Sequence, residues 1–338
     1  MARVGFVIDR IMRGVGLHGK AFIPMLGGLA CAVPAVMATR TIESRRDRLL
    51  TMLVIPVMSC SARLPVYVLI TAVVFAPSED RLGFLSMGAL ALFFLYAFST
   101  VATLLIATVL RRTILKGPKP KLLLELPPYR KPAIMNLLRN AWDNVRAFLG
   151  EAGTIILAMT VVMWALLSYP KLDAADYPTF SKDTSAEHQR ALVAQAELEH
   201  SFAGRIGKGL EPIMKPLGFD WRISVGILGA FVAREVFVST LGTVFGLGQS
   251  DENSKPLRAS LKRATWPDGR PLFPPLAGFS LMIFFVFACQ CMSTIAVVKR
   301  ESGSWKWPMF MFAYMTVLAY SASFAVYQLG KALGVGLS

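Results

Sequence analysis

Four cysteines and one adjacent pair of opposite charges lie inside apolar parts of this 338-residue sequence. They are Cys31, Cys60, Cys289 and Cys291, and the charged pair is Arg234 and Glu235. Thiolate and carboxylate groups are ligands that a borderline transition-metal ion accepts. An ionisable residue in an apolar span is costly to insert and usually marks a functional site. The sequence therefore predicts metal ligands at the four cysteines and at Glu235, with Arg234 beside them.

Cys31 lies where an apolar helix should break. Residues 21–39 are apolar, but two prolines and a Gly27-Gly28 pair interrupt them. Proline removes a backbone donor and clashes with the preceding helical turn, and glycine weakens a helix. Broken helices of this kind surround the binding sites of many transporters.

Cys60 lies in a second predicted break. It is part of Ser59-Cys60-Ser61, between Pro56 and Pro65, and we expect the helix to kink or unwind there. Further candidates for the transport path adjoin the cysteines and the charged pair: Met58, Ser59, Ser61, Arg63, Arg234 and Met292.

Each candidate also has a plain structural interpretation. A buried cysteine can be simply a small hydrophobic residue, and Cys289 and Cys291 would point to different faces of one helix. Arg234 and Glu235 can neutralise each other in an internal ion pair; alternatively, Glu235 meets the ion and Arg234 repels cations. For Arg63 we expect a structural role, paired with a carboxylate or a lipid phosphate.

The composition is typical of a membrane protein. Hydrophobic residues make up 54% of the chain and charged residues 17%, and the formal net charge is +15. Lys and Arg fall between the apolar runs, as in cytoplasmic loops, so the charge does not predict a nucleic-acid partner. Cysteines confined to apolar segments do not predict a secreted disulfide framework. We expect an all-α polytopic protein whose partner is the lipid bilayer.

Four predicted regions follow one another along the chain. The first repeat, residues 1–110, has a broken segment at 21–39 and spans at 49–75 and 83–110. Residues 111–169 hold a basic linker, an amphipathic helix near 133–149 and a connecting span at 151–169. Residues 170–203 form a polar loop, expected outside. The second repeat, 204–338, has a broken segment at 223–247 and spans at 276–298 and 307–330.

Basic residues predict the topology of the two broken segments. Lys20 precedes residues 21–39 and Arg45 follows them, which favours a re-entrant hairpin open to the cytoplasm over a spanning helix. Residues 11–39 also align without a gap with residues 213–241. Three predicted spans separate the two broken segments, so the second repeat should be inverted relative to the first.

Three long motifs resemble the membrane region of the bacterial ferrous-iron transporter family FeoB. They read PMLGGLACAVPAVMATRTIESRRDRLLTMLVIPVMSCSARLPVYVL, AREVFVSTLGTVFG and FACQCMSTIAVVKRESGSWKWPMFMFAYM. The first motif has Ala30 and Ala32 in GLACAVP, where the family usually shows GFGCNVP, so an Asn that could serve as a ligand or cap is replaced. The resemblance covers essentially the whole chain.

The resemblance implies uptake of Fe2+, as cargo and not as a permanent cofactor, across the bacterial inner membrane by a multi-pass protein. The sequence contains no P-loop motif GxxxxGK[ST], so we expect no enzyme activity, with GTP acting only through the family's separate GTP-binding domain. The expected partners are that domain or subunit and small accessory proteins of the iron uptake system. A homo-oligomer is left open.

Two other classes of function compete with iron transport. Gate repeats of this kind also resemble those of nucleoside permeases, so a carrier of nucleosides or other small organic solutes is the alternative. Cysteines inside the apolar segments favour a metal, because nucleoside sites use aromatic stacking and amide or carboxylate pairing. A scaffold without transport is disfavoured by the cost of placing Arg234 and Glu235 in an apolar segment.

Overall fold

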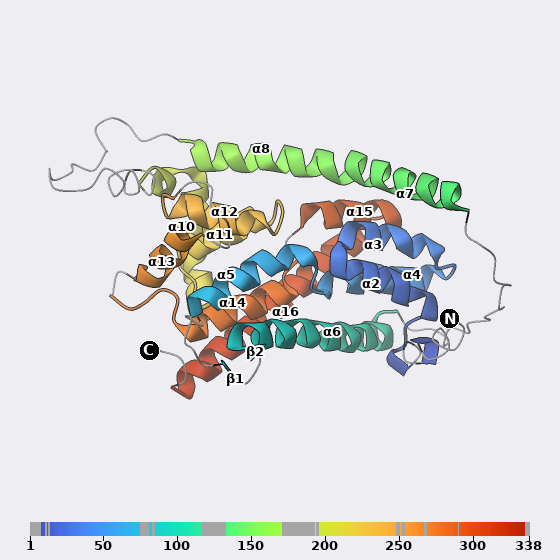
Figure 1. The fold of residues 1–338 in the computed structure, drawn as a ribbon, viewed down its shortest axis with the longest axis horizontal. Helices are drawn as coiled ribbons and strands as arrows, with labels where there is room; N and C mark the ends of the chain where they lie inside the picture. Colours follow the sequence, from blue (N-terminus) through green and yellow to red (C-terminus); the bar gives the residue numbers. More distant parts are fainter. Residues whose placement is uncertain are drawn as a thin grey trace. The chain divides into compact units, whose positions relative to one another are not determined.

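The computed structural model describes residues 8–10, 12, 14–74, 81–82, 85–115, 133–170, 193, 196–247, 251, 254–266, 269–289 and 291–334. In this part the chain is helical, apart from a pair of two-residue strands, β1 (Arg81–Leu82) and β2 (Leu85–Ser86), and one isolated bridge (Figure 1). The predicted all-α fold is therefore confirmed. Most of the predicted basic linker and of the polar loop lies outside the described residues.

The helices of the described residues follow one another along the chain. Their bounds are α2 (Phe22–Ala30), α3 (Ala32–Ala38), α4 (Arg45–Val54), α5 (Leu64–Val74), α6 (Met87–Thr113), α7 (Ile134–Phe148), α8 (Thr154–Ser168), α10 (Phe202–Met214), α11 (Trp221–Ala230), α12 (Val236–Val244), α13 (Lys255–Arg263), α14 (Pro275–Phe287), α15 (Met292–Ser302) and α16 (Lys306–Ala332). A π-helical turn, Leu149–Gly153, joins α7 to α8.

Helices long and apolar enough to cross a membrane match the predicted spans. They cover Arg45–Val74, Gly88–Thr113, Pro275–Ser302 and Lys306–Ala332. The fifth predicted span, 151–169, corresponds to α8, whose 15 residues reach only about 22 Å of a hydrocarbon core of about 30 Å. The residues described therefore support a polytopic membrane protein, and the fifth span stays a prediction.

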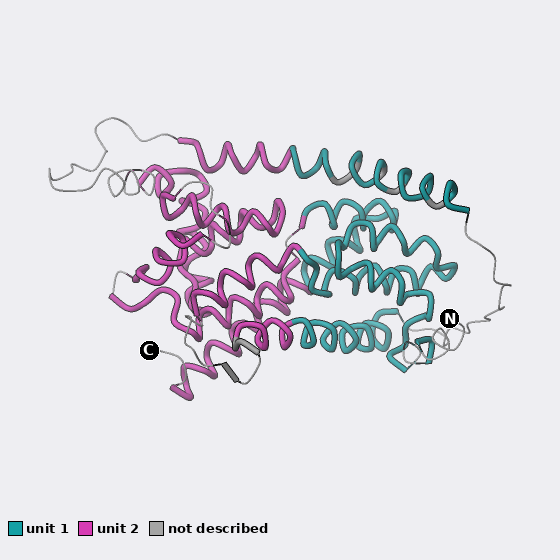
Figure 2. The backbone as a smooth tube through the Cα atoms, viewed as in Figure 1, with its two compact units in different colours: residues 1–61, 96–157, 292–314 teal, residues 62–95, 158–291, 315–338 magenta. Residues whose placement is uncertain are grey.

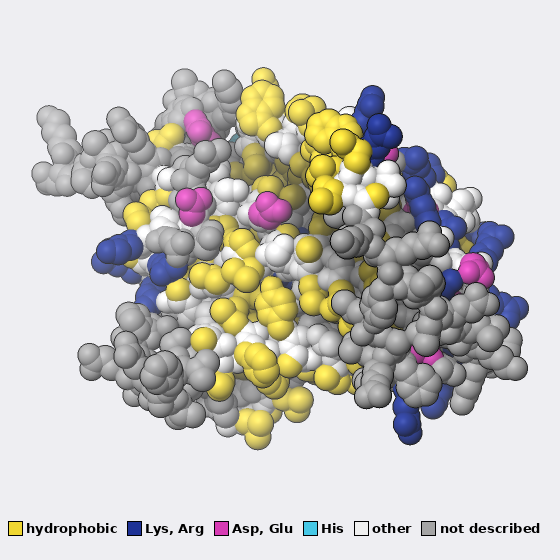
Figure 3. Space-filling view, turned by 45° about the vertical axis from the view of Figure 1, so that its right-hand side comes forward, with side chains coloured by type: hydrophobic (Ala, Val, Ile, Leu, Met, Phe, Trp, Pro, Cys, Tyr) yellow, Lys and Arg dark blue, Asp and Glu magenta, His cyan; other side chains and the backbone are white. Residues whose placement is uncertain are grey.

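Large apolar side chains are exposed along these helices. They include Phe93 and Leu105 on α6, Trp164 on α8 and Val317 on α16. Apolar side chains are also spread over the face shown in the space-filling view (Figure 3). A soluble protein rarely exposes this much apolar surface, whereas a lipid bilayer is itself apolar. The exposed side chains are therefore expected to face lipid.

The chain divides into two compact units built from interleaved segments (Figure 2). Unit 1 comprises residues 1–61, 96–157 and 292–314, and unit 2 comprises residues 62–95, 158–291 and 315–338. The predicted repeats are continuous stretches of sequence, so their boundaries remain a prediction.

The first broken segment is a pair of short helices in unit 1. Between α2 and α3, Cys31 has an extended backbone (φ −152°, ψ 134°). Pro34 stands in the first turn of α3, where a missing backbone donor is tolerated, but it could not continue α2. A side chain at Gly27 would touch Ala35, so the two helices pack closely. The break predicted in residues 21–39 is confirmed.

The second broken segment is the corresponding pair in unit 2, α11 and α12. Gly226 and Gly229 have no side chain, and a Cβ there would collide with Phe237 and Thr240 on the facing helix. Asp220 caps α11, because its carboxylate accepts from the Ile223 N–H at 2.9 Å. Burial, outweighing this hydrogen bond, raises the pKa of Asp220 to about 6.

Candidate functional site

The two breaks of the first repeat lie side by side in unit 1. The Ser61 hydroxyl donates to the carbonyl oxygen of Ala30 at 2.9 Å, and these residues are direct neighbours of Cys60 and Cys31. A Cβ added at Gly28 would stand 3.9 Å from the sulfur of Met58. Cys60 is buried, Cys31 is partly buried, and neither is part of a disulfide. The structure thus brings the first predicted group of candidates to one place.

The helix is unwound at Cys60, as predicted. α4 ends at Val54, residues 58–60 are not helical, and α5 begins at Leu64. Unwinding in an apolar region leaves backbone groups without helical partners, which is costly unless another group satisfies them. Here Ser99 of α6 accepts from the Ser59 N–H at 2.9 Å and donates to the Val57 carbonyl at 3.1 Å.

Ser99 is a residue that the sequence analysis missed. Its only signal is a polar Ser99-Thr100 pair within a predicted span, and serine in a helix commonly bonds its own backbone. A long-range contact across 40 residues could not be anticipated from that pattern. Because its hydroxyl is neutral, Ser99 satisfies the break without placing a charge beside the cysteine.

The second group of candidates lies in unit 2, where α14 ends. Residues 288 and 289 follow the helix without continuing it. Arg234, buried at the turn between α11 and α12, donates from Nη2 to the carbonyl oxygen of Ala288 at 3.2 Å. A cation at a helix C-terminus interacts favourably with the unpaired carbonyls and the helix dipole. Arg234 therefore caps α14 immediately before Cys289.

Two arginines act electrostatically on the sulfur of Cys289. The charges of Arg234 and Arg63 both reach this thiol, and Cys291 interacts with it as well. Arg63 is fully buried, which favours the predicted structural role. The expectation that Cys289 and Cys291 point to different helix faces does not apply, because neither residue is helical.

Glu235 and its neighbour Arg234 do not form the internal ion pair considered from the sequence. Both lie in the described part of the chain, and no salt bridge joins them there. Arg234 is buried toward Ala288, whereas Glu235 is exposed next to the start of α12. The carboxylate is therefore open to an approaching cation.

The described residues contain no preformed metal centre. Among them, no group of three or more His, Cys, Asp and Glu side chains could hold a metal ion. Met292, the remaining sulfur candidate, is partly buried at the start of α15. Any ion at these breaks would be bound by few side chains, together with backbone oxygens.

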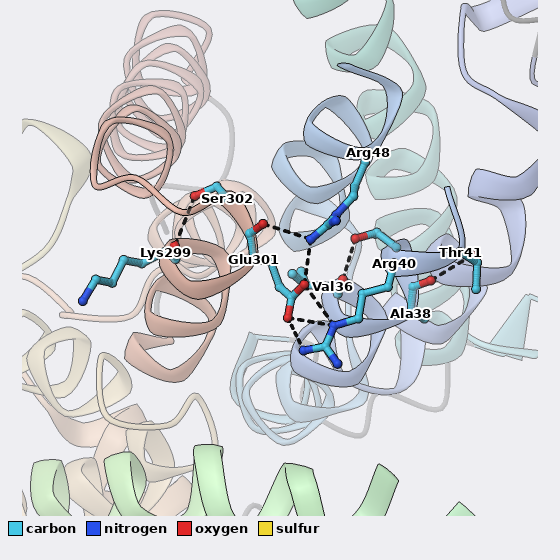
Figure 4. Close-up of polar contacts among 9 residues, drawn as sticks. Val36, Ala38, Arg40, Thr41, Arg48, Lys299, Glu301 and Ser302 are labelled. Carbon is cyan, nitrogen blue, oxygen red and sulfur yellow. Dashed lines mark hydrogen bonds and ion pairs between the residues drawn. The ribbon is translucent and has the colours of Figure 1, made fainter. Parts of the chain in front are cut away.

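Two arginines of the first repeat, Arg40 and Arg48, have a partner that the sequence analysis did not identify. Glu301, at the end of α15, is only 4% exposed and receives hydrogen bonds from Arg40 and Arg48 (Figure 4). Arg40 Nε lies 3.0 Å from both carboxylate oxygens, and Arg48 Nη2 lies 2.8 Å from Oε2 and 2.9 Å from the Glu301 carbonyl. These bonds fix the exit of the first hairpin against α15.

Comparison with protein families gives two matches that together cover most of the chain. A model of the Gate family, described as nucleoside recognition, matches residues 1–74 and 149–305. A second model, described as ferrous iron transport protein B C terminus, matches residues 92–144. No solved structure matches the chain.

Curated relatives are similar over nearly the whole chain. The Fe(2+) transporter FeoB of Leptospira interrogans is 45% identical over 97% of this chain, and that of Leptospira biflexa is 42% identical over 99%. An Fe(2+) transport protein A/Fe(2+) transporter FeoB fusion protein of Porphyromonas gingivalis is 37% identical over 98%. The chain spans less than half the length of these relatives, 45%, 46% and 40% respectively.

Proposed function

Because this chain belongs to the ferrous-iron transporter FeoB family, we propose that it is the permeation portion of a bacterial Fe2+ uptake system. The observation that carries the proposal is the hydrogen bond from Ser61 to Ala30, which holds the two breaks of the first repeat together. Two cysteines and the backbone oxygens of two broken helices thereby share one place in an apolar region. Soft sulfur and carbonyl oxygen together suit a borderline cation such as Fe2+.

Ion binding at the first break would use Cys31 and Cys60 as thiolate ligands. A divalent cation loses hydration on entering an apolar region, and a ligand charge must offset that loss. Metal binding deprotonates the thiols, so the ion itself brings about the charge it needs. Met58 and the hydroxyls of Ser59 and Ser61 would add weaker, readily exchanged contacts.

The second break would act as a gate that controls the passage of the ion. Arg234 and Arg63 both act on Cys289, and their charges oppose a cation there. Glu235 is exposed one residue from Arg234 and can attract the ion. Passage would then require Arg234 to leave the Ala288 carbonyl, with Cys289 and Cys291 available after it has moved.

The same proposal includes the setting of the chain. We place it in the bacterial inner membrane as a multi-pass protein, with the second repeat inverted relative to the first. A GTP-binding domain or subunit would regulate it, and small accessory proteins would assist. The relative from Porphyromonas gingivalis, whose name joins transport protein A to FeoB, supports an accessory partner. Self-association into a homo-oligomer is compatible with this setting.

Uptake of Fe2+ into proteoliposomes tests the proposal. The purified chain is reconstituted alone and together with the GTP-binding portion of a relative. We expect time-dependent accumulation of Fe2+ kept reduced by ascorbate, above protein-free vesicles, in at least one of the two preparations. Absence of accumulation in both would contradict the proposal.

The Gate description, nucleoside recognition, favours a nucleoside carrier as the second candidate. The same vesicles are therefore given radiolabelled uridine in place of iron. Uridine uptake without iron uptake would establish the second candidate. Iron uptake that is unaffected by excess uridine would exclude a shared path.

A further inference from the structure

One buried hydroxyl group in unit 1 has no hydrogen-bond partner. The side chain of Ser293 is only 1% exposed, and its Oγ is the one buried hydroxyl oxygen among the described residues that neither donates nor accepts a hydrogen bond. A buried polar group without a partner destabilises the folded state. Such a group calls for an explanation, of which a role in binding an ion is one.

The place of Ser293 in its helix explains why the usual partner is missing. Serine and threonine inside a helix commonly donate to the carbonyl oxygen four residues earlier. Thr103 of α6 does so, with the Ser99 carbonyl at 2.7 Å. Ser293 is the second residue of α15, and the residue four positions earlier, Cys289, is not helical. The hydroxyl of Ser293 is therefore left available to a ligand.

The packing of α15 brings Ser293 to the level of the first break. α15 packs against α3, which begins directly after Cys31, and both helices belong to unit 1 (Figure 1). The C-terminal ends of the two helices are joined by the hydrogen bonds between Arg40 and Glu301. Ser293 precedes Glu301 by eight positions, and Cys31 precedes Arg40 by nine. At about 1.5 Å per residue, both lie about 12–14 Å from the joined ends.

The hydroxyl would add an oxygen to a place where the predicted ligands are mainly sulfur. Thiolates favour soft ions such as Zn2+, whereas oxygen ligands favour harder ions such as Mn2+. A site with both kinds of atom suits an ion between these extremes. We propose that Ser293 Oγ is a ligand of Fe2+ at the first break and helps to determine which metal ion is accepted. This inference rests on the proposed function and assigns one further residue to it.

The first test measures stability and ion binding in the same variant. Ser293→Ala removes the unpaired hydroxyl, so the purified full chain in detergent should melt at a higher temperature than the parent when no metal is present. Fe2+ is then added without oxygen, and the rise in melting temperature is followed against its concentration. We expect half-maximal stabilisation of the variant to need about tenfold more Fe2+ than that of the parent, as for loss of other metal partners. A packing residue would not combine higher stability with weaker binding.

The second test changes the ligand atom from oxygen to sulfur. In Ser293→Cys, Zn2+ should compete with Fe2+ at a lower concentration than in the parent, and Mn2+ at a higher one. The matched control is Ser302→Cys, at the other end of α15. Ser302 is also buried, but its hydroxyl donates to the carbonyl oxygens of Lys299 and Ser304, at 3.4 and 3.1 Å. The control should melt at a lower temperature and keep the metal preference of the parent.

Three results would overturn the proposal. A melting temperature of Ser293→Ala that is not above that of the parent would show that another group or a bound water already satisfies the hydroxyl. Equal half-maximal Fe2+ concentrations for the parent and Ser293→Ala would show that the hydroxyl does not meet the ion. A parent chain that Fe2+ does not stabilise would exclude the site altogether. These readouts do not depend on transport, so failure of Fe2+ uptake into vesicles would contradict the proposed function separately.

Discussion

The helix break beside Cys60 and the break beside Cys289 are satisfied by different chemistry. In unit 1, the neutral hydroxyl of Ser99 bonds the unwound backbone. In unit 2, the guanidinium of Arg234 bonds the carbonyl of Ala288, the residue that follows α14. Both solutions remove the cost of unpaired backbone groups in an apolar region. The Ser99 cap is neutral, whereas the Arg234 cap places a positive charge next to Cys289, so the two caps act differently on a cation.

The two breaks share a sequence pattern but differ in the function that we propose for them. Both breaks have cysteine beside small or polar residues, and both follow a helical hairpin. The first break, whose Ser99 cap is neutral, is suited to hold Fe2+. The second break is suited to repel Fe2+ until Arg234 moves. Four substitutions test this difference.

The largest effect is expected when the first break loses its thiol. Cys60→Ser should lower Fe2+ uptake about tenfold or more, because a hydroxyl does not supply the charge of a thiolate. Loss of a residue that only hydrogen-bonds a metal ligand already costs about 10–100-fold in affinity or activity, and loss of a ligand should cost at least as much. Cys289→Ser should lower uptake by less. Thr100→Ser, an exposed change near Ser99, is the control. Uptake by Cys60→Ser equal to that of the parent would show that Cys60 only packs.

The next effect concerns the exposed carboxylate beside the arginine cap. Glu235→Gln keeps the shape and a neutral oxygen but removes the charge that attracts the ion. We expect most uptake to be lost while the melting temperature of the purified protein stays unchanged, since Glu235 forms no ion pair within the described residues. A stable variant with full uptake would refute the role of Glu235.

A smaller effect is expected from removing the neutral cap. Ser99→Ala leaves the Ser59 N–H and the Val57 carbonyl without their partner, at a cost of about 1–2 kcal/mol for two hydrogen bonds in a membrane protein. Thermal or denaturant unfolding in detergent measures the loss. The same stability for Ser99→Ala and Thr100→Ser would mean that the break is satisfied in another way.

The smallest effect is a pH dependence at the start of the second hairpin. The pKa of Asp220 is raised from 3.8 to about 6, so the folded state keeps this proton where the unfolded chain has lost it. The contribution of Asp220 to stability should therefore fall as the pH rises from about 4 to about 6. Asp220→Asn keeps a good helix cap and should remove this dependence. If unfolding of Asp220→Asn depended on pH in the same way as unfolding of the parent, the predicted role of Asp220 would be contradicted.

Some features of the fold could be predicted from the residues of one short segment. Pro34 with the Gly27-Gly28 pair, and Pro56 with Pro65, locate the two breaks of the first repeat, because proline acts on its own turn. The long apolar runs locate the spans, since length and hydropathy alone decide whether a helix can cross a bilayer. The length of α8 could not be read in this way, because the apolar pattern there continues from an amphipathic helix.

The sequence by itself determined the class of the protein, the two helix breaks of the first repeat and which residue types could meet a metal ion, but not the break at Cys289. These depend on propensity and hydropathy, which act within a few residues. Tertiary structure alone decided that Ser61 bonds Ala30, that Ser99 covers the first break, that Arg234 caps α14 and that Glu301 neutralises Arg40 and Arg48. Each of these contacts joins residues 31 to 261 positions apart. Their partners are selected by packing, because a buried polar group must find whichever partner the folded chain brings to it.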